Sequence, residues 1–183
     1  MPGISQALRK LVETLDKENV PSMLIGGYAL PAYGRIRATQ DIDIAIAAPF
    51  SEVVRLHRLL VERGFQLPSS PNEQAPLFLV TDLENKAEIE VWTRPDGIVF
   101  DDELLRRRVR VSPFGDGFEM FTIGPEDFIV NKLSRKDRGV QDEMDVVSVL
   151  ELQKAALDYG YLAERAKASG VLGLLRGLMD RAT

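Results

Sequence analysis

The 183-residue chain has a net charge of −5 and contains no cysteine, so disulfide bonds and thiolate zinc sites are excluded. Its hydrophobic fraction of 45% is sufficient for a folded core, whereas the negative charge disfavours binding of nucleic acid through non-specific phosphate contacts. No apolar stretch reaches the roughly 20 residues of a membrane span and the first residues lack a signal-peptide layout, so we expect a soluble cytoplasmic protein without membrane contacts.

Hydrophobic periodicity and turn residues predict mixed helices and strands first and helices alone towards the end. In chain order, the predicted elements are a helix over 4–18, a strand over 23–25, a short helix over 28–33, a strand over 41–46, a helix over 51–63, strands over 77–81 and 87–93, a helix near 101–107, a hairpin of strands 109–111 and 118–122, and helices near 125–135, 140–152, 159–168 and 171–181. Ser5 and Ser51 are candidate N-caps, and Gly64 is a candidate helix stop.

The number and spacing of these strands indicate the fold class. They are too few and too irregularly spaced for a doubly wound sheet, so we expect an α+β fold with a small mixed sheet and helices on one side of it. The pattern becomes purely helical near Gly124. This change predicts a core over residues 1–124 and a C-terminal helical segment over 125–183 that packs on the core.

The most informative motif is a pair of aspartates in one predicted strand. Asp41 and Asp43 share a strand face because side chains two residues apart point the same way, and Ile42, Ile44 and Ile46 occupy the other face. Two carboxylates on one face repel each other unless a cation lies between them. Mg²⁺ prefers such hard oxygen ligands, so the pair predicts a metal site, with a merely solvent-facing strand as the alternative.

A third acid on a neighbouring strand would complete a metal site. The predicted strand over 87–93 contains Glu88 and Glu90, which share a face by the same spacing rule. We favour Glu90 because Ile89 and Val91 place it at the centre of the strand. Glu88 remains open as the third acid, with a solvent-facing role as its alternative.

Gly26 and Gly27 lie where a strand turns into a helix, so their backbone N–H groups could bind a phosphate. Arg37 follows closely, and an arginine here could hold phosphate oxygens in a bidentate manner, although an ion pair with a nearby acid is an equal alternative. Thr39 could orient the same loop through a hydrogen bond to the backbone. The motif therefore predicts a site for a metal-bound nucleoside triphosphate.

Lys132 lies off the apolar stripe of the helix near 125–135, which leaves two alternatives: it reaches a phosphate, or it is solvated. Asp142 and Asp145 lie three residues apart on the next helix and so share a face, where they could pair with Lys132 or Arg138 or be solvated.

The remaining distinctive side chains carry less chemical information. His57, the only histidine, is expected on the polar face of the 51–63 helix and thus at the surface, which gives histidine-based nucleophilic catalysis little support. We expect Trp92 and Tyr28 to be core or wall residues.

Two segments resemble a known superfamily. The segment Gly-Gly-Tyr-Ala … Arg-x-Thr-x-Asp-Ile-Asp-Ile resembles the nucleotidyltransferases related to DNA polymerase β, in particular the bacterial branch of AbiEii-like toxins and aminoglycoside nucleotidyltransferases. The later segment Pro-Glu-Asp-Phe-Ile-Val-Asn-Lys-Leu … Asp-x-x-Asp-Val is similar to the helical part of that branch. The resemblance covers roughly residues 20–150, and it implies a nucleotidyltransferase core followed by helices.

The resemblance assigns roles to residues of this chain. It implies a two-metal Mg²⁺ site formed by Asp41, Asp43 and Glu90, which would also be the catalytic residues, and a triphosphate site formed by Gly26 and Gly27, with Lys132 near the nucleotide. Arg37 and Thr39 belong to the matching segment and would contact the nucleotide. The chain departs from the pattern twice, since many members have serine in place of Gly27 and aspartate in place of Glu90.

The implied activity is transfer of a nucleoside monophosphate from an NTP to a hydroxyl group. The acceptor stays open between a small molecule, a tRNA end and a protein, and the toxin branch implies a cognate antitoxin as partner. An acidic chain suits a cationic small molecule, whereas the arginine-rich segment 106–110 could dock a tRNA. The alternative is a non-catalytic interaction module that retains the nucleotidyltransferase fold.

Overall fold

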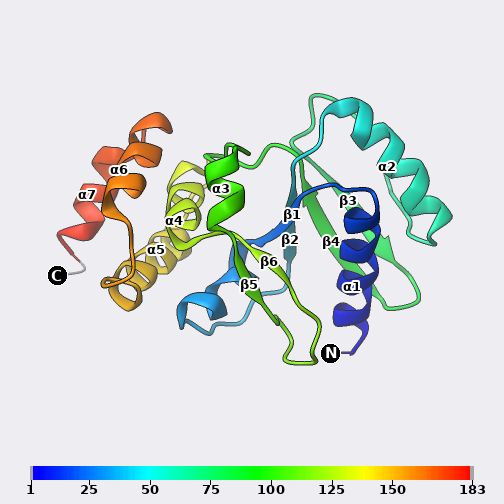
Figure 1. The fold of residues 1–183 in the computed structure, drawn as a ribbon, viewed down its shortest axis with the longest axis horizontal. Helices are drawn as coiled ribbons and strands as arrows, with labels where there is room; N and C mark the ends of the chain where they lie inside the picture. Colours follow the sequence, from blue (N-terminus) through cyan, green and yellow to red (C-terminus); the bar gives the residue numbers. More distant parts are fainter. Residues whose placement is uncertain (1, 182–183) are drawn as a thin grey trace.

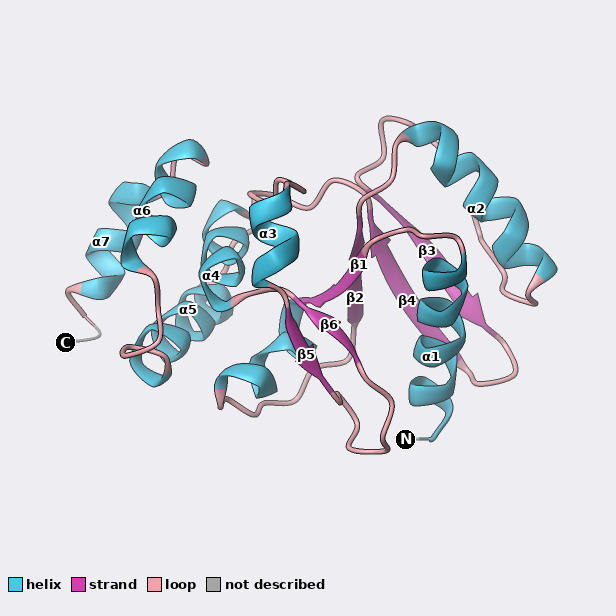
Figure 2. Ribbon diagram, in the orientation of Figure 1, coloured by secondary structure: helices cyan, strands magenta, loops and turns pink. Residues whose placement is uncertain are grey.

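The computed structural model describes residues 2–181 as a mixed six-stranded sheet with helices on both faces (Figure 1, Figure 2). Its elements in chain order are α1 (Pro2–Lys17), β1 (Ser22–Ile25), the 3₁₀ helix η1 (Gly26–Tyr33), β2 (Ile42–Ile46), α2 (Phe50–Glu62), β3 (Leu77–Asp82), β4 (Ala87–Trp92), α3 (Asp102–Arg107), β5 (Val109–Val111), β6 (Met120–Thr122), α4 (Pro125–Ser134), α5 (Val140–Leu152), α6 (Tyr159–Ala168) and α7 (Leu172–Met179). Among these described residues, no helix has both the length and the apolar character that crossing a membrane requires.

The strand order is β3-β4-β2-β1-β6-β5. Neighbouring strands β2 and β4 run parallel, as do β1 and β6, whereas the other three pairs are antiparallel. The expected α+β fold with a small mixed sheet is therefore confirmed. The β3–β4 pair is a local hairpin, while the parallel β2–β4 pair requires the chain to cross over through α2 and β3.

The alternation of side chains divides the core into two layers. Ile42, Ile44 and Ile46 face α1 and α2, where they pack with residues such as Leu8 and Leu56. Met23, Ile25 and Ala45 face the opposite layer, which contains η1 and residues of α4–α7. Figure 1 shows α1 and α2 on one side of the sheet and α4–α7 on the other. The expectation of helices on one side was wrong, because both strand faces carry apolar residues that need cover.

Two expected helix caps are not found. Ser51 lies within α2, where Pro49 occupies the N-cap position and no side chain caps the helix. Ser5 lies within α1, and its hydroxyl donates a hydrogen bond to Asp116 instead. Pro49 has extended backbone, with a φ of −66° and a ψ of 161°, and α2 begins directly after it.

His57 is buried, with 6% of its surface exposed, so its expected surface position was wrong. Strand β3 covers this face of α2, and the His57 ring packs against Phe78 with centroids 4.5 Å apart. Burial lowers the pKa of His57, which keeps the ring neutral. The helical pattern alone could not show that an edge strand covers this face.

The helices that follow Gly124 are tied together by a buried carboxylate. Asp127 on α4 accepts hydrogen bonds from the Tyr161 hydroxyl on α6, at 3.0 and 2.8 Å, and Arg165 lies 3.6 Å away. Residues of α4–α7 share an apolar cluster with β1 and η1. The subdivision at residue 124 stays a prediction.

The Asp127 carboxyl gives stability a pH dependence of defined sign. Burial raises its pKa from an ordinary 3.8 to about 6. A carboxyl with a raised pKa in the folded state stabilises the fold below its unfolded pKa, and this contribution is lost as pH rises through about 6. We expect the free energy of unfolding of the protein, minus that of Asp127→Asn, to fall by up to about 3 kcal/mol between pH 4 and pH 7. Urea denaturation at several pH values measures this difference, and parallel pH profiles would contradict the assignment.

Candidate functional site

The candidate site is organised by the parallel pair β2–β4, which places Asp43 directly opposite Glu90. The same register places Ala45 opposite Trp92. The indole N–H of Trp92 donates to Asp43 Oδ1 at 3.1 Å and to Glu90 Oε2 at 3.2 Å. Asp43 thus lies on the face opposite Ile42 and Ile44, as the alternation predicts, and it meets an acid on the neighbouring strand.

The two carboxyls lie close together, and among residues 2–181 neither of them forms an ion pair with a lysine or arginine. Burial raises the pKa of Asp43, and burial together with the nearby Asp43 carboxyl raises the pKa of Glu90. In such a pair the second carboxyl ionises with a raised pKa unless a nearby cation compensates the negative charge. The donor set of this pair contains only carboxylate oxygen, which suits a hard divalent cation such as Mg²⁺.

The glycine turn approaches this pair closely. Gly26 follows β1 and has a φ of +65°, and a Cβ atom there would overlap Asp43 Oδ2 and lie 2.8 Å from Asp43 Cγ. A Cβ at Gly27 would lie 2.6 Å from Thr39 Oγ1 and 3.1 Å from Arg37 Nη2. The turn therefore has room for glycine only, and it brings bare backbone beside Asp43, Thr39 and Arg37.

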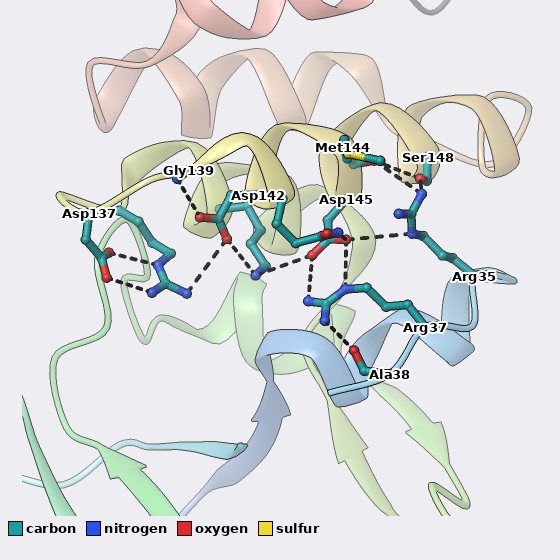
Figure 3. A network of polar contacts seen from close by, with 12 residues as sticks. Arg35, Arg37, Ala38, Asp137, Gly139, Asp142, Met144, Asp145 and Ser148 are labelled. Atoms are coloured by element: carbon teal, nitrogen blue, oxygen red, sulfur yellow. Dashed lines mark hydrogen bonds and ion pairs between the residues drawn. The ribbon is translucent and has the colours of Figure 1, made fainter. Parts of the chain in front are cut away.

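Arg37 forms a bidentate ion pair with Asp145 of α5, with Nε–Oδ1 at 3.0 Å and Nη2–Oδ2 at 2.9 Å (Figure 3). Arg35 reaches the same carboxylate at 3.6 Å and also donates to the Ser148 hydroxyl. Of the two roles that the sequence left open for Arg37, the ion pair is present in the structure. Its partner is a distant acid, and the pair holds Arg37 against the glycine turn.

Lys132 is 3% exposed, so a solvated role is excluded. Its Nζ donates to Asp142 Oδ1 at 2.8 Å and lies 3.5 Å from Asp145 Oδ2, one of the pairings expected for these acids. Every residue from Glu126 to Leu133 is buried, because α4 packs against α5, α6 and η1. A position off the apolar stripe therefore does not face solvent here.

Two cavities are lined by some of the expected site residues, whereas Gly27, Arg37 and Thr39 line neither. A cavity of about 40 Å³ is lined by Gly26, Asp43, Trp92, Lys132 and Arg135, among others. A second cavity of about 160 Å³ is lined by Asp41, Glu88 and Glu90.

Asp41 lies just before β2 and is exposed, and it lines the same cavity as Glu90 without sharing the Trp92 hydrogen bonds of the Asp43–Glu90 pair. Across residues 2–181, no three acid, histidine or cysteine side chains gather closely enough to hold a metal ion. The structure brings two of the three expected acids together.

Sequence reasoning missed the role of Trp92. It lies two residues after Glu90, and this spacing puts both side chains on one strand face. The spacing was therefore a usable signal. The position of the Asp145 carboxylate had no such signal, because Arg37 and Asp145 lie 108 residues apart in the chain.

Comparison with protein families supplies an independent finding. Residues 4–170 match the family model "Nucleotidyl transferase of unknown function (DUF2204)". A comparison with curated protein sequences gives no significant match.

Solved structures with a similar fold include three nucleotidyltransferases or proteins like them. ANT(2'')-Ia in complex with adenylyl-2''-tobramycin is 14% identical at a TM-score of 0.55, over 91% of this chain and 96% of that one. An antigenic nucleotidyltransferase-like protein from Paracoccidioides brasiliensis is 18% identical at 0.54, over 98% and 93%. The lincosamide antibiotic adenylyltransferase LnuA with bound lincomycin is 14% identical at 0.51, over 80% and 96%. At identities of 14–18%, these structural similarities show likeness of fold alone.

The glycine turn yields a prediction with a matched control. Gly26→Ala combines a left-handed backbone with overlap of Asp43, whereas Gly115 has a similar φ of +66° and no neighbour within 4 Å of an added Cβ. We expect Gly115→Ala to lower the free energy of unfolding by about 1 kcal/mol, from backbone strain alone. Gly26→Ala should lower it by several-fold more, because a side chain or the backbone must also move. Urea denaturation compares the two, and equal losses would contradict the close approach.

The ion-pair network yields a second prediction. Asp145→Asn removes a completely buried carboxylate and leaves Arg37 without its bidentate partner, so we expect a loss of about 3–5 kcal/mol in the free energy of unfolding. Asp137→Asn removes an exposed ion pair with Arg135 and should change stability by less than about 1 kcal/mol. Chemical denaturation of both variants measures the contrast, which would disappear if the Asp145 network were weakly coupled to the fold.

Proposed function

The chain belongs to the nucleotidyl transferase family that matches residues 4–170, and from this membership we propose that it transfers a nucleoside monophosphate from an NTP to a hydroxyl group of a small acceptor molecule. The observation that carries the proposal is the pairing of Asp43 with Glu90 through Trp92, beside the Gly26 turn. Acids on adjacent strands can hold a divalent cation, and bare backbone N–H groups beside them can bind the phosphates of a nucleotide.

The metal in this proposal is Mg²⁺, held by Asp43 and Glu90; Asp41, which lines the same cavity as Glu90, would have to move closer to become the third oxygen ligand. The fit rests on the all-oxygen donor set and on the cross-strand register that places Asp43 opposite Glu90. When bound, Mg²⁺ would neutralise charge on the phosphate oxygens and lower the pKa of the acceptor hydroxyl. Glu88 lines the same cavity as Asp41 and Glu90, and it is the alternative third acid.

The other residues of the site would bind and orient the triphosphate. The backbone of Gly26 and Gly27 would approach its phosphates, since no side chain fills the turn. Arg37 and Lys132 would supply positive charge from positions fixed by Asp145, and Thr39 would hold the loop against Gly27.

The proposed reaction is an in-line displacement at the α-phosphorus. The acceptor oxygen forms a new P–O bond, the bond to the β-phosphate oxygen breaks, and pyrophosphate leaves. Glu90 would accept the proton of the attacking hydroxyl, a role that its position beside Asp43 on the neighbouring strand would allow.

A small hydroxylated acceptor is favoured by two observations. The net charge of −5 suits a cationic molecule, and solved structures of similar fold include enzymes crystallised with lincomycin or an adenylylated tobramycin. The arginine-rich segment supports tRNA docking less than its sequence suggested. Arg107 pairs with Glu103 and Asp158, and Arg108 donates to the Ser22 carbonyl, so both have structural roles.

The test uses α-labelled NTPs with mixed acceptors and compares Glu90→Gln with Glu88→Gln. We expect label on a small molecule, with transfer lowered at least 100-fold in Asp43→Asn and Glu90→Gln and by less than twofold in Glu88→Gln, which changes an exposed acid on the same strand. The reverse order of the two glutamates would move the third acid to position 88.

The acceptor that carries the label separates the remaining interpretations. Label on tRNA or on a protein would favour the toxin role, with a cognate antitoxin as partner. Binding of Mg²⁺-NTP without transfer to any acceptor would indicate a non-catalytic module. Undiminished Mg²⁺-NTP binding by Asp41→Asn and Asp43→Asn, measured by calorimetry, would refute the site assignment.

A further inference from the structure

Trp92 is the only tryptophan of the chain, and it has an unusual position at the end of β4. Its single indole N–H lies between two carboxylates, 3.1 Å from Asp43 Oδ1 and 3.2 Å from Glu90 Oε2. The sheet register explains why the ring fits there. The residue opposite Trp92 on β2 is Ala45, whose small side chain leaves room for the indole on this face.

The hydrogen-bonding chemistry of the Trp92 indole also suits its position between the two carboxylates. An indole N–H is a neutral donor that accepts nothing, so it can orient both carboxylates without cancelling their charge. The nearest cations behave differently, because Lys132 pairs with Asp142 and Arg135 pairs with Asp137. A lysine at position 92 would instead neutralise the pair and compete with any incoming cation.

The position of the Glu90 carboxyl depends on the same hydrogen bond from Trp92. Glu90 is one methylene longer than an aspartate, so its carboxyl has one more rotatable bond to fix. The Trp92 N–H gives that carboxyl a defined position next to Asp43. Packing alone would not require the N–H, since a phenylalanine could fill the apolar part of this half-buried position.

We infer that Trp92 is a positioning residue, whose indole N–H holds Asp43 and Glu90 as a preformed pair of oxygen ligands for the divalent cation. This inference rests on the proposed function, because it assigns Trp92 to the proposed cation site. It extends that function by adding a residue that touches the carboxylates and sets their separation. Groups that orient metal ligands in this way commonly change metal affinity by 10-fold to 100-fold when removed.

The single tryptophan provides a direct spectroscopic test. A ¹⁵N-labelled sample should show one indole N–H cross-peak, which we expect to broaden first when Mn²⁺ is added well below one equivalent. Mg²⁺ should shift the same peak saturably. In Asp43→Asn, Mn²⁺ should leave it nearly unchanged at the same concentration. A peak that responds to neither ion, in a protein shown to bind Mn²⁺, would overturn the inference.

The second test measures affinity in variants. The EPR signal of free Mn²⁺ reports binding to the protein, to Trp92→Phe and to Phe121→Leu, which trims an aromatic ring packed against the same apolar cluster. We expect Trp92→Phe to bind Mn²⁺ at least 10-fold more weakly and Phe121→Leu within twofold of the unmodified protein. Denaturation curves establish that both variants are folded at the assay temperature.

The outcomes separate the inference from the proposed function. Unchanged Mn²⁺ affinity in Trp92→Phe would overturn the positioning role and leave the proposed function standing. Equal losses in both variants would also overturn it, since any disturbance of the cluster would then suffice. If the unmodified protein binds neither Mn²⁺ nor Mg²⁺-NTP, the proposed function itself fails.

Discussion

The buried carboxylate of Asp145 is the interaction on which the arrangement of the site depends. It is completely buried, and it accepts a bidentate ion pair from Arg37 and further contacts from Lys132, Arg35 and Gln141. A buried charge is tolerated only when several donors compensate it, so these groups have little freedom to move apart. Asp145 therefore fixes the positions of the loop before β2, helix α4 and helix α5 relative to one another. The glycine turn lies against that loop.

The charged residues of the site form two groups. In one group cations are paired with carboxylates, and in the other two carboxylates lie side by side. On the α5 side the cations are paired with carboxylates: Lys132 with Asp142, and Arg35 and Arg37 with Asp145. On the sheet side, Asp43 and Glu90 share only a neutral hydrogen bond from Trp92, and both pKa values are raised. The nearby positive charges are thus fixed on other carboxylates, and the paired acids have no cation of their own among the described residues.

Much of the fold followed from local patterns, whereas the site followed only in part. Strand alternation correctly placed Asp43 opposite Ile42 and Ile44, and the predicted helices and strands are all present within a few residues of their expected limits. Two features of tertiary packing were not predicted. Helix α4 is buried on every side because other helices enclose it, and His57 is covered by β3. The hydrophobic periodicity of a helix does not show either feature, because the segments that bury these residues are distant in the sequence.

The parallel pairing of β2 and β4 also has a kinetic consequence. Trp92 and Asp43 lie 49 residues apart, and they meet only after the chain has crossed over through α2 and returned along the β3–β4 hairpin. Such non-local pairing forms slowly, because the entropy of closing a long loop must be lost before the contacts form. Because Glu90 and Trp92 belong to the local β3–β4 hairpin and Asp43 does not, the pair of acids is complete only in the finished sheet.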